Sequence, residues 1–282
     1  SEMCIRDRNT SRRKDFVGIN GETSWLLITD HHTGMEYGET FRSKASPVEW
    51  IREFLQVHSP NLRDKYVFMD QGGELFGNPD IINVFRRHHY EIHPTGTDAS
   101  HQNGPVERAH RVVGDHVRAL LIGANLDIKF WPYAFFHHLR INNAMAMNGQ
   151  DSSRIFQATG TKENFTGFCT FGCRTWIRPP GKRSVKFKHN IVKGIFLGFI
   201  PRTKRNILWY NCETGNIGDA NHVTFDEGMN DLPFQILPPN QRDLERAELG
   251  DKFPAEPGKV DVEDELQFYL YPFTNCLLYT SP

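Results

Sequence analysis

The sequence lacks long apolar runs, and its longest purely apolar stretches contain four to five residues. A helix that crosses a bilayer needs about 20 such residues, so we expect no membrane-spanning helix. The sequence also has no secretory signal pattern at its start, no internal repeat and no Gly-rich phosphate loop. What remains is the composition of an ordinary globular protein, with 38% hydrophobic, 12% aromatic and 24% charged residues.

Cysteine is scarce, with only five residues, at positions 4, 169, 173, 212 and 276. None of them forms a Cys-x-x-Cys pair. Cys169 and Cys173 have no His partner at the spacing that metal sites use. We therefore expect neither a structural zinc site nor a disulfide framework, but reduced thiols of an intracellular protein.

The overall charge is close to neutral, at −1, but it is unevenly distributed. Residues 104–205 contain 17 Lys and Arg against 5 Asp and Glu, whereas residues 206–265 contain 4 against 14. The basic half could bind a polyanion while the acidic segment stays solvated. A basic surface that only keeps a domain soluble explains the same numbers, so charge alone leaves both interpretations open.

The first half of the chain predicts a mixed sheet covered by helices. Short apolar runs bounded by turn residues are typical of buried strands, and Ser-Pro, Asn-Pro or Gly-Pro pairs mark helix starts. The expected strands are 25–29, 35–41, 66–69 and 90–93, and the expected helices begin at Pro47, Pro79 and Pro105, with another over 127–142.

The second half changes character after about residue 150. Short strands separated by turn residues predict a small separate β-barrel over 165–228. Its interior should contain Trp176, Phe196, Leu197 and Trp209. Residues 229–275 are acidic, rich in Pro and without periodicity, which indicates a linker. Residues 1–8 and 276–282 resemble translated sequencing-adapter read-through, so we set them aside from the fold and place the first domain at 9–150.

Two carboxylates stand where a metal site could form. Asp70 follows a strand of four apolar residues, and Glu107 lies in the first turn of a helix after a polar loop, with 36 residues between them. Clustered carboxylates repel one another unless they share a divalent cation such as Mg²⁺, which prefers oxygen ligands. Taken singly, each has an ordinary explanation, because acidic residues are common at strand ends and helix starts.

The strings around these residues resemble a known family. Residues 66–75 read YVFMDQGGEL and residues 94–108 read PTGTDASHQNGPVER. Both are similar to the segments around the second and third acidic residues of copia-type retrotransposon integrases. FWPYA at 130–134, FGC at 171–173 and KGIFLGF at 193–199 resemble later segments of the same proteins, so the resemblance spans about 14–228.

The resemblance implies a fold and a chemistry. Its members have a ribonuclease-H-like α/β fold, a mixed sheet flanked by helices, followed by a small SH3-like β-barrel. An Asp-Asp-Glu triad holds Mg²⁺ or Mn²⁺ and catalyses 3′ processing and strand transfer of element DNA into target DNA. The implied partners are double-stranded DNA and further copies of the chain, with no membrane and no small-molecule substrate. The implied location is the nucleus, after a cytoplasmic virus-like-particle stage.

The first Asp of the triad is assigned to Asp15, with Asp30 as the alternative. In the family this residue lies on the strand before a hairpin, and Asp15 precedes the expected hairpin by a short distance. The apolar residues expected just upstream are replaced by Ser-Arg-Arg-Lys. Spacing does not decide between Asp15 and Asp30, so the predicted catalytic and metal-binding set is Asp15, Asp70 and Glu107.

Cations near Glu107 are the predicted DNA contacts. On a helix, residues three and four positions apart share a side, which groups His110, Arg111 and Arg118 with Glu107. The family's corresponding helix contacts DNA. Asn103, in an expected mobile Asn-Gly turn, and Lys182 and Arg183, in a basic loop, complete the predicted set. Arg108 and His110 could equally be solvated surface, and Trp25 and Trp131 are expected in the core.

Two other functions are compatible with the sequence. One is a transposase or nuclease that shares the ribonuclease-H fold, and the other is an inactive integrase remnant that binds DNA without cleaving it. The presence of Asp70 and Glu107 in their motifs disfavours decay, whereas the altered segment before Asp15 favours it.

Overall fold

The computed structural model describes residues 2–9, 16–43, 47–59, 65–70, 75–95, 100–146, 149–162, 168–178, 191–200 and 206–228. All of them belong to one compact unit, Ser1–Phe234; a second unit, Gln235–Pro282, lies outside the described residues. The predicted linker over 229–275 and the basic loop with Lys182 and Arg183 therefore also lie outside them. Among the described residues, no helix is long and apolar enough to cross a membrane.

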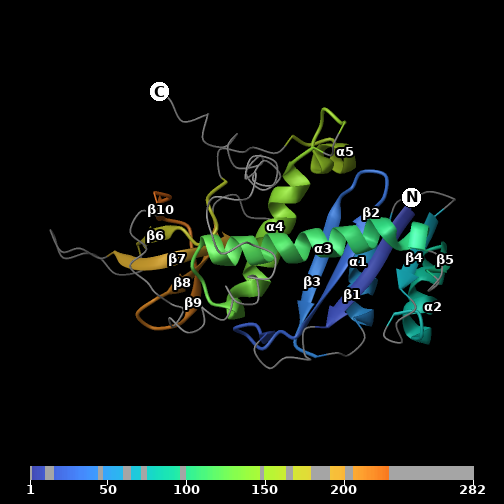
Figure 1. The fold of residues 1–282 in the computed structure, drawn as a ribbon, viewed down its shortest axis with the longest axis horizontal. Helices are drawn as coiled ribbons and strands as arrows, with labels where there is room; N and C mark the ends of the chain where they lie inside the picture. Colours follow the sequence, from blue (N-terminus) through green and yellow to red (C-terminus); the bar gives the residue numbers. More distant parts are fainter. Residues whose placement is uncertain are drawn as a thin grey trace, which may run out of the picture. The chain divides into compact units, whose positions relative to one another are not determined.

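The first half folds around a five-stranded sheet with the order β3-β2-β1-β4-β5 (Figure 1). Its strands are β1 (Glu2–Asn9), β2 (Ser24–Asp30), β3 (Glu36–Phe41), β4 (Lys65–Asp70) and β5 (Tyr90–Thr95). β1 is antiparallel to β2 and parallel to β4, β2 is antiparallel to β3, and β4 is parallel to β5. The predicted mixed sheet with covering helices is confirmed.

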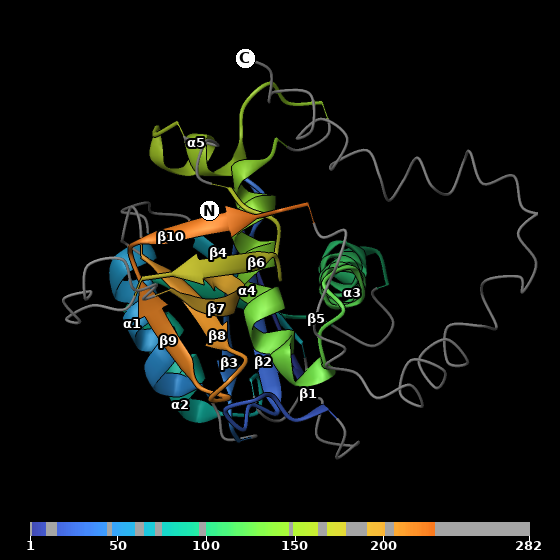
Figure 2. The same cartoon turned by 90° about the vertical axis from the view of Figure 1, so that its left-hand side faces the viewer.

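Helices cover both faces of this sheet. α1 (Val48–His58) and α2 (Pro79–Arg87) lie on one side, and α3 (Ser100–Gly123) lies on the other, where α4 (Trp131–Ala144) also packs (Figure 2). Alternation along β2 shows the division, because Leu26 joins the core beneath α1 and α2, whereas Trp25 stacks on His110 of α3 and contacts Phe135 of α4. Trp25 and Trp131 are buried, as predicted.

The segment that the sequence analysis set aside is part of this sheet. Glu2–Asn9 forms β1, the central strand, and Met3 and Ile5 are buried in the core with α1 and α2. β1 joins the two halves of the sheet, because β2 pairs with one of its edges and β4 with the other. The first domain therefore includes residues that lie before position 9.

The starts of α2 and α3 show how far the local sequence determines where a helix begins. Asn78 caps α2, where its side-chain oxygen accepts a hydrogen bond from the Asp80 backbone N–H at 2.9 Å, and Pro79 follows at the first helical position, as the Asn-Pro pair predicts. The prediction that α3 begins at Pro105 was wrong, because α3 begins at Ser100. The Gln-Asn-Gly segment expected in a mobile turn is therefore helical.

The second half forms an antiparallel sheet with the order β10-β6-β7-β8-β9. Its strands are β6 (Arg174–Ile177), β7 (Val192–Phe199), β8 (Ile207–Asn211), β9 (Ile217–Ala220) and β10 (Val223–Asp226). β10 and β9 are the two edges, so the described residues form an open sheet, not the closed barrel that was predicted. β9 and the short α5 (Arg154–Thr159) were not predicted.

The interior of the second sheet differs from the prediction at one residue. Phe196 and Leu197 are buried, and half-buried Trp209 packs against the same core as Phe196. Trp176 does not join this core: on β6 the buried residues are Thr175 and Ile177, while Trp176 is half-buried with the Lys193 ammonium 5.1 Å from its ring centre. The alternation of side chains along β6 was predicted correctly, but the buried face is the one with Thr175 and Ile177, and not the one with Trp176.

A β-bulge interrupts the pairing of β7 with β8. Phe196 pairs with Trp209 and Gly198 pairs with Leu208, which leaves Leu197 as the extra residue. Gly198 has a φ of 148°, a conformation that a side chain would disfavour.

The second sheet packs on α4 instead of forming a separate body. Phe130, just before α4, contacts Tyr210 edge to face at 5.0 Å, and His137 of α4 contacts Phe171 and Phe196. Gly172 approaches Ala124 so closely that an added Cβ would lie 2.2 Å from the Ala124 Cβ. The two sheets therefore share a packed boundary centred on α4.

Candidate functional site

Asp70 is the last residue of β4, next to the centre of the first sheet. β4 lies between β1 and β5, and Asp70 pairs with Thr95, the last residue of β5. Because β1, β4 and β5 are parallel, their carboxyl ends lie toward the same edge. The backbone thus places Asp70 at the edge where parallel sheets commonly present functional side chains. The side chain of Asp70 is outside the described residues.

Glu107 lies in the first half of α3, one helical turn before His110. His110 is buried, with its ring stacked on Trp25 of β2 at 4.6 Å between ring centres, and Val113 is buried one turn further on. These residues hold α3 against the face of the sheet opposite α1 and α2. The side chain of Glu107 is outside the described residues, so its distance to Asp70 is not given by the structure.

The predicted first carboxylate, Asp15, lies outside the described part of the chain, so the strand before the β2–β3 hairpin is described instead. That strand is β1. The acidic residue in the second half of β1 is Asp7, which pairs with Leu26. Ile5 pairs with Met69, so Asp7 lies two residues beyond this pair and Asp70 one residue beyond it. The backbone of Asp7 therefore reaches the same edge as Asp70.

Asp30, the alternative first carboxylate, is at a different level of the sheet. It pairs with Met3, and Met3 pairs with Val67, three residues before Asp70 and two strands away. Strand spacing puts the two Cα atoms roughly 14 Å apart. Its carboxylate already accepts hydrogen bonds from the backbone N–H and the hydroxyl of Thr33. Asp30 stabilises the β2–β3 turn and is poorly placed to share an ion with Asp70.

Metal binding is not tested by the described side chains. Among them, no group of three or more His, Cys, Asp or Glu could hold a metal ion, and the carboxylates of Asp15, Asp70 and Glu107 are not among them. The donor chemistry of this predicted set fits a hard divalent cation, because all its ligands would be carboxylate oxygens. Among the described residues, Cys169, Cys173 and Cys212 form no disulfide.

The predicted DNA contacts divide into three groups. Arg111 and Arg118 are exposed on α3, where Arg118 also pairs with Asp115 at 2.9 Å, and Arg108 is exposed beside them. His110 is a correction: it is only 5% exposed, and its stacking on Trp25 makes it a packing residue. Asn103 lies in α3 with its side chain outside the described residues, and Lys182 and Arg183 lie outside them entirely.

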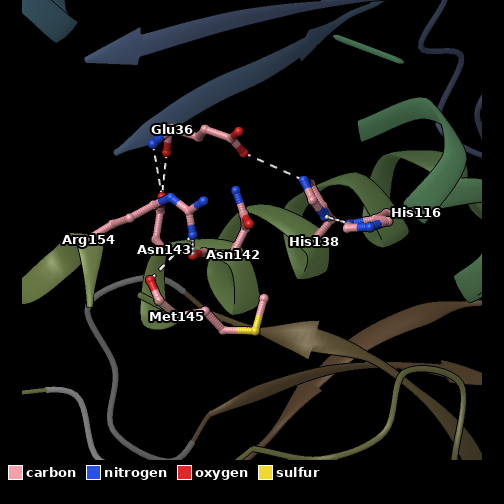
Figure 3. A network of polar contacts seen from close by, with 7 residues as sticks. All are labelled: Glu36, His116, His138, Asn142, Asn143, Met145 and Arg154. Atoms are coloured by element: carbon pink, nitrogen blue, oxygen red, sulfur yellow. Dashed lines mark hydrogen bonds and ion pairs between the residues drawn. The ribbon is translucent and has the colours of Figure 1, made fainter. Parts of the chain in front are cut away.

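A buried polar network lies between β3, α3 and α4 (Figure 3). The backbone N–H of Glu36 donates to Asn143 Oδ1 at 2.8 Å, and Asn143 Nδ2 donates to the Glu36 carbonyl at 2.7 Å. The Glu36 carboxylate lies 3.5 Å from His138 Nε2, and His138 Nδ1 is 3.0 Å from His116 Nδ1. The network ties the edge strand β3 to α4, and α4 to α3.

Sequence reasoning missed this network, although a signal was present. α4 contains His137-His138 and Asn142-Asn143 among apolar residues, and all four side chains are buried. Buried polar groups normally have hydrogen-bond partners, so polar pairs within an apolar helix indicate tertiary contacts. The partners Glu36 and His116 lie far away in the sequence, and no local pattern identifies them.

Burial controls the protonation of two histidines in this region. It lowers the pKa of His137 to about 3, with the charges of Arg140 and His138 adding to the effect. Burial and the neighbouring His138 also lower the pKa of His116, against the opposing influence of Glu36 and Asp115. Both rings are therefore neutral at pH 7.

Comparison with known proteins gives distant relatives. No protein-family model matches the chain. The chain is 25% identical over 215 residues to the retrovirus-related Pol polyprotein from transposon RE1 of Arabidopsis thaliana, which covers 74% of this chain and 14% of the relative. It is 23% identical over 217 residues to the corresponding polyprotein from transposon RE2 of the same organism. The matched region is 75% of this chain and 14% of that relative. The chain is thus similar to one short portion of retrotransposon Pol polyproteins.

Proposed function

We propose that this chain is the integrase portion of a copia-type retrotransposon Pol polyprotein. Its reaction would be polynucleotidyl transfer, first by water in 3′ processing and then by the new 3′ hydroxyl in strand transfer. In each step an oxygen nucleophile forms a bond to phosphorus, the old phosphorus–oxygen bond breaks, and the departing 3′ oxygen takes up a proton. The proposal includes a ribonuclease-H-like fold for the first half.

The placement of Asp70 and α3 is the observation that carries this proposal. The strand that ends at Asp70 is next to the central strand β1, and the helix that contains Glu107 packs over one face of that sheet near β1. Two acidic residues with 36 residues between them are thus brought to a strand end and to a helix beside it. The similarity to Pol polyproteins over about three quarters of the chain supports the same assignment.

Asp70, Glu107 and Asp15 are the residues proposed to hold Mg²⁺ or Mn²⁺. Bound divalent ions would activate the nucleophile and stabilise the departing oxygen. The protein's own contribution would be to bring the three carboxylates together, where a shared cation would offset their mutual repulsion. Arg111 and Arg118, exposed on the same helix as Glu107, would hold DNA through its phosphates.

The first carboxylate needs its own comparison, because β1 carries Asp7 to the edge at which Asp70 lies. Asp7→Asn, Asp15→Asn and Asp30→Asn form a matched series in which each change removes one charge. We expect Asp15→Asn to abolish joining. Loss of joining in Asp7→Asn, with normal joining in Asp15→Asn, would move the first position to β1.

The main test is Glu107→Gln in a Mg²⁺-dependent joining reaction on oligonucleotides. The replacement keeps the shape of the side chain but removes the charge that holds the cation, so we expect joining to fall by several orders of magnitude while DNA binding remains. Arg111→Ala is the matched change on the same helix. It should weaken DNA binding across sequences and reduce the slope of log affinity against log salt by about one.

The outcomes separate the candidate functions. Normal joining by Glu107→Gln would refute its catalytic role. Equal loss of joining and binding would indicate that Glu107 is structural. A wild-type chain that binds DNA but does not join it would favour the inactive remnant, which the altered segment before Asp15 also favours. The oligomeric state and a nuclear location with a virus-like-particle stage belong to the same proposal.

A further inference from the structure

We propose that His116 is a positioning residue, whose hydrogen bond to His138 fixes the axial position of α3 and thereby the position of Glu107. The inference rests on the proposed function, because it assigns a role in the transfer reaction. It is carried by the geometry of the buried network of Glu36, His116, His138, Asn142, Asn143 and Arg154 (Figure 3).

Among the described side chains of α3, several make contacts without strong directionality. Val113 and Leu121 are buried apolar side chains, and His110 stacks on Trp25. Such packing tolerates small shifts along the helix axis better than a hydrogen bond, which weakens steeply with distance and angle. The bond between His116 and His138 joins α3 to α4, whereas the bond between Arg118 and Asp115 stays within α3.

The acceptor side of this bond is rigidly supported. His138 lies on α4, and α4 is bound to β3 through the paired hydrogen bonds between Asn143 and the backbone of Glu36. At the end of α4, the guanidinium of Arg154 donates to the Asn142 carbonyl at 2.6 Å and to the Met145 carbonyl at 3.3 Å. α4 is therefore held in place by several hydrogen bonds, and the bond from His116 fixes the position of α3 relative to α4.

The tautomers follow from the Glu36 carboxylate. Glu36 faces His138 Nε2 and favours a proton on that nitrogen. With the proton on Nε2, His138 Nδ1 carries a lone pair, so His116 donates its Nδ1–H to His138 Nδ1. One proton then lies on His138 Nε2, facing Glu36, and one proton lies between the two Nδ1 atoms.

A second proton on this pair would break the bond, because two N–H groups would then face each other. The charged and titratable groups around His116 are His138 on α4, Glu36 on β3 and Asp115 on α3, with Arg154 of α5 close enough to Glu36 to influence it. Burial lowers the pKa of His116 below its ordinary value, so the bond is intact near neutral pH and is lost only on acidification.

The distance to Glu107 is short enough for rigid transmission. His116 lies nine positions after Glu107 along α3, which corresponds to roughly 14 Å of helix. A displacement of α3 at His116 would move Glu107 by a similar amount. Misplacing a catalytic group by about 1 Å can cost about 100-fold in rate.

The test compares His116→Asn with His116→Gln in the full 282-residue chain. The Asn amide occupies the place of Nδ1 and can still donate to His138, whereas the Gln amide occupies the place of Nε2 and cannot. We expect kcat for joining to fall about 10- to 100-fold in His116→Gln, with KM for DNA unchanged, and to stay within about threefold in His116→Asn. Equal effects of the two substitutions would overturn the proposal.

The pH profile separates positioning from general stability. Wild-type joining should lose activity on the acid side as the histidine pair gains its second proton, and His116→Asn should lose activity at a lower pH. An identical acid limb in both proteins would refute the role of the pair. If His116→Gln does not fold, the reciprocal pair His138→Asn and His138→Gln makes the same distinction, since only Asn keeps an acceptor at Nδ1.

Amide hydrogen exchange keeps this inference distinct from the proposed function. His116→Gln should speed exchange in the first half of α3, residues 100–112, and His116→Asn should not. If the wild-type chain joins no DNA, the proposed function fails while the exchange result still decides whether His116 anchors α3. Equal exchange in all three proteins would overturn the anchoring itself.

Discussion

α3 and α4 pack on the same face of the first sheet, but they are built differently. α4 buries ten of its fourteen residues, including two histidines and two asparagines. In the described part of α3, buried His110, Val113 and Leu121 alternate with exposed residues such as Arg111 and Arg118. A helix buried on nearly all sides is part of a core, whereas an amphipathic one presents a surface. The comparison indicates that α4 supports the fold and α3 presents the candidate functional residues.

The largest effect on stability should come from α4. Phe135 is buried between α4 and the first sheet, where its ring contacts Trp25 at 5.0 Å and occupies the space beside Gly38. Phe135→Ala should lower the free energy of unfolding by about 3–5 kcal/mol, because it removes buried surface and leaves a cavity. Urea unfolding followed by circular dichroism measures this loss.

Phe136 is the matched control, since it is the next residue of α4 and is 39% exposed. Phe136→Ala should cost well under half as much as Phe135→Ala. Equal costs for the two substitutions would show that α4 does not divide into a core side and a solvent side as described.

An intermediate effect is expected on acidification, from His137 of α4. Its folded pKa of about 3 lies below the value of about 6.5 in an unfolded chain. Between these values the unfolded chain binds a proton that the folded chain excludes. The free energy of unfolding is therefore highest above about pH 6.5 and decreases as the pH falls from there. The slope should be about 1.4 kcal/mol per pH unit for this single group.

His137→Leu provides the comparison for the pH experiment, because it cannot titrate. Unfolding free energies of both proteins are measured between pH 7 and pH 5, and wild type should lose stability more steeply than the variant. Parallel curves for the two proteins would mean that His137 can be protonated in the folded state.

The smallest effect on stability should come from the exposed side of α3. Arg118 is 55% exposed and pairs with Asp115 within one turn, so Arg118→Gln should change the free energy of unfolding by less than about 0.5 kcal/mol. Under the proposed function it should nevertheless lower the salt dependence of DNA binding by about one unit of slope. A large stability loss with unchanged binding would reverse the division of roles between α3 and α4.

The sequence predicted much of the first sheet, because its strands are short apolar runs with clear turn residues. β2, β4 and α2 were predicted within a few residues of their observed bounds. The central strand β1 was missed because its residues were set aside as foreign, and its place in the sheet is visible only through its pairing with β2 and β4. β9, with the sequence Ile-Gly-Asp-Ala, has too little apolar character to be recognised.

The residues of the candidate site could be predicted where they lie within a short contiguous motif. Asp70 and Glu107 were identified from contiguous strings, and the structure places the first at a strand end and the second in a helix. His110 was misassigned because helical spacing cannot tell which side of α3 meets Trp25. The link from Glu36 through His138 to His116 joins three elements, and only the fold brings those residues together.

The bulge in β7 has a consequence for comparing related sequences. Five consecutive residues, Gly194 to Gly198, are buried, and the extra Leu197 shifts the register of β7 against β8. Removing a residue other than the extra Leu197 would turn the side chains on one side of the deletion to the opposite face. The number of residues between the two glycines is therefore as informative as their identity, and an alignment that opens a gap inside this stretch would pair residues that occupy different places in the fold.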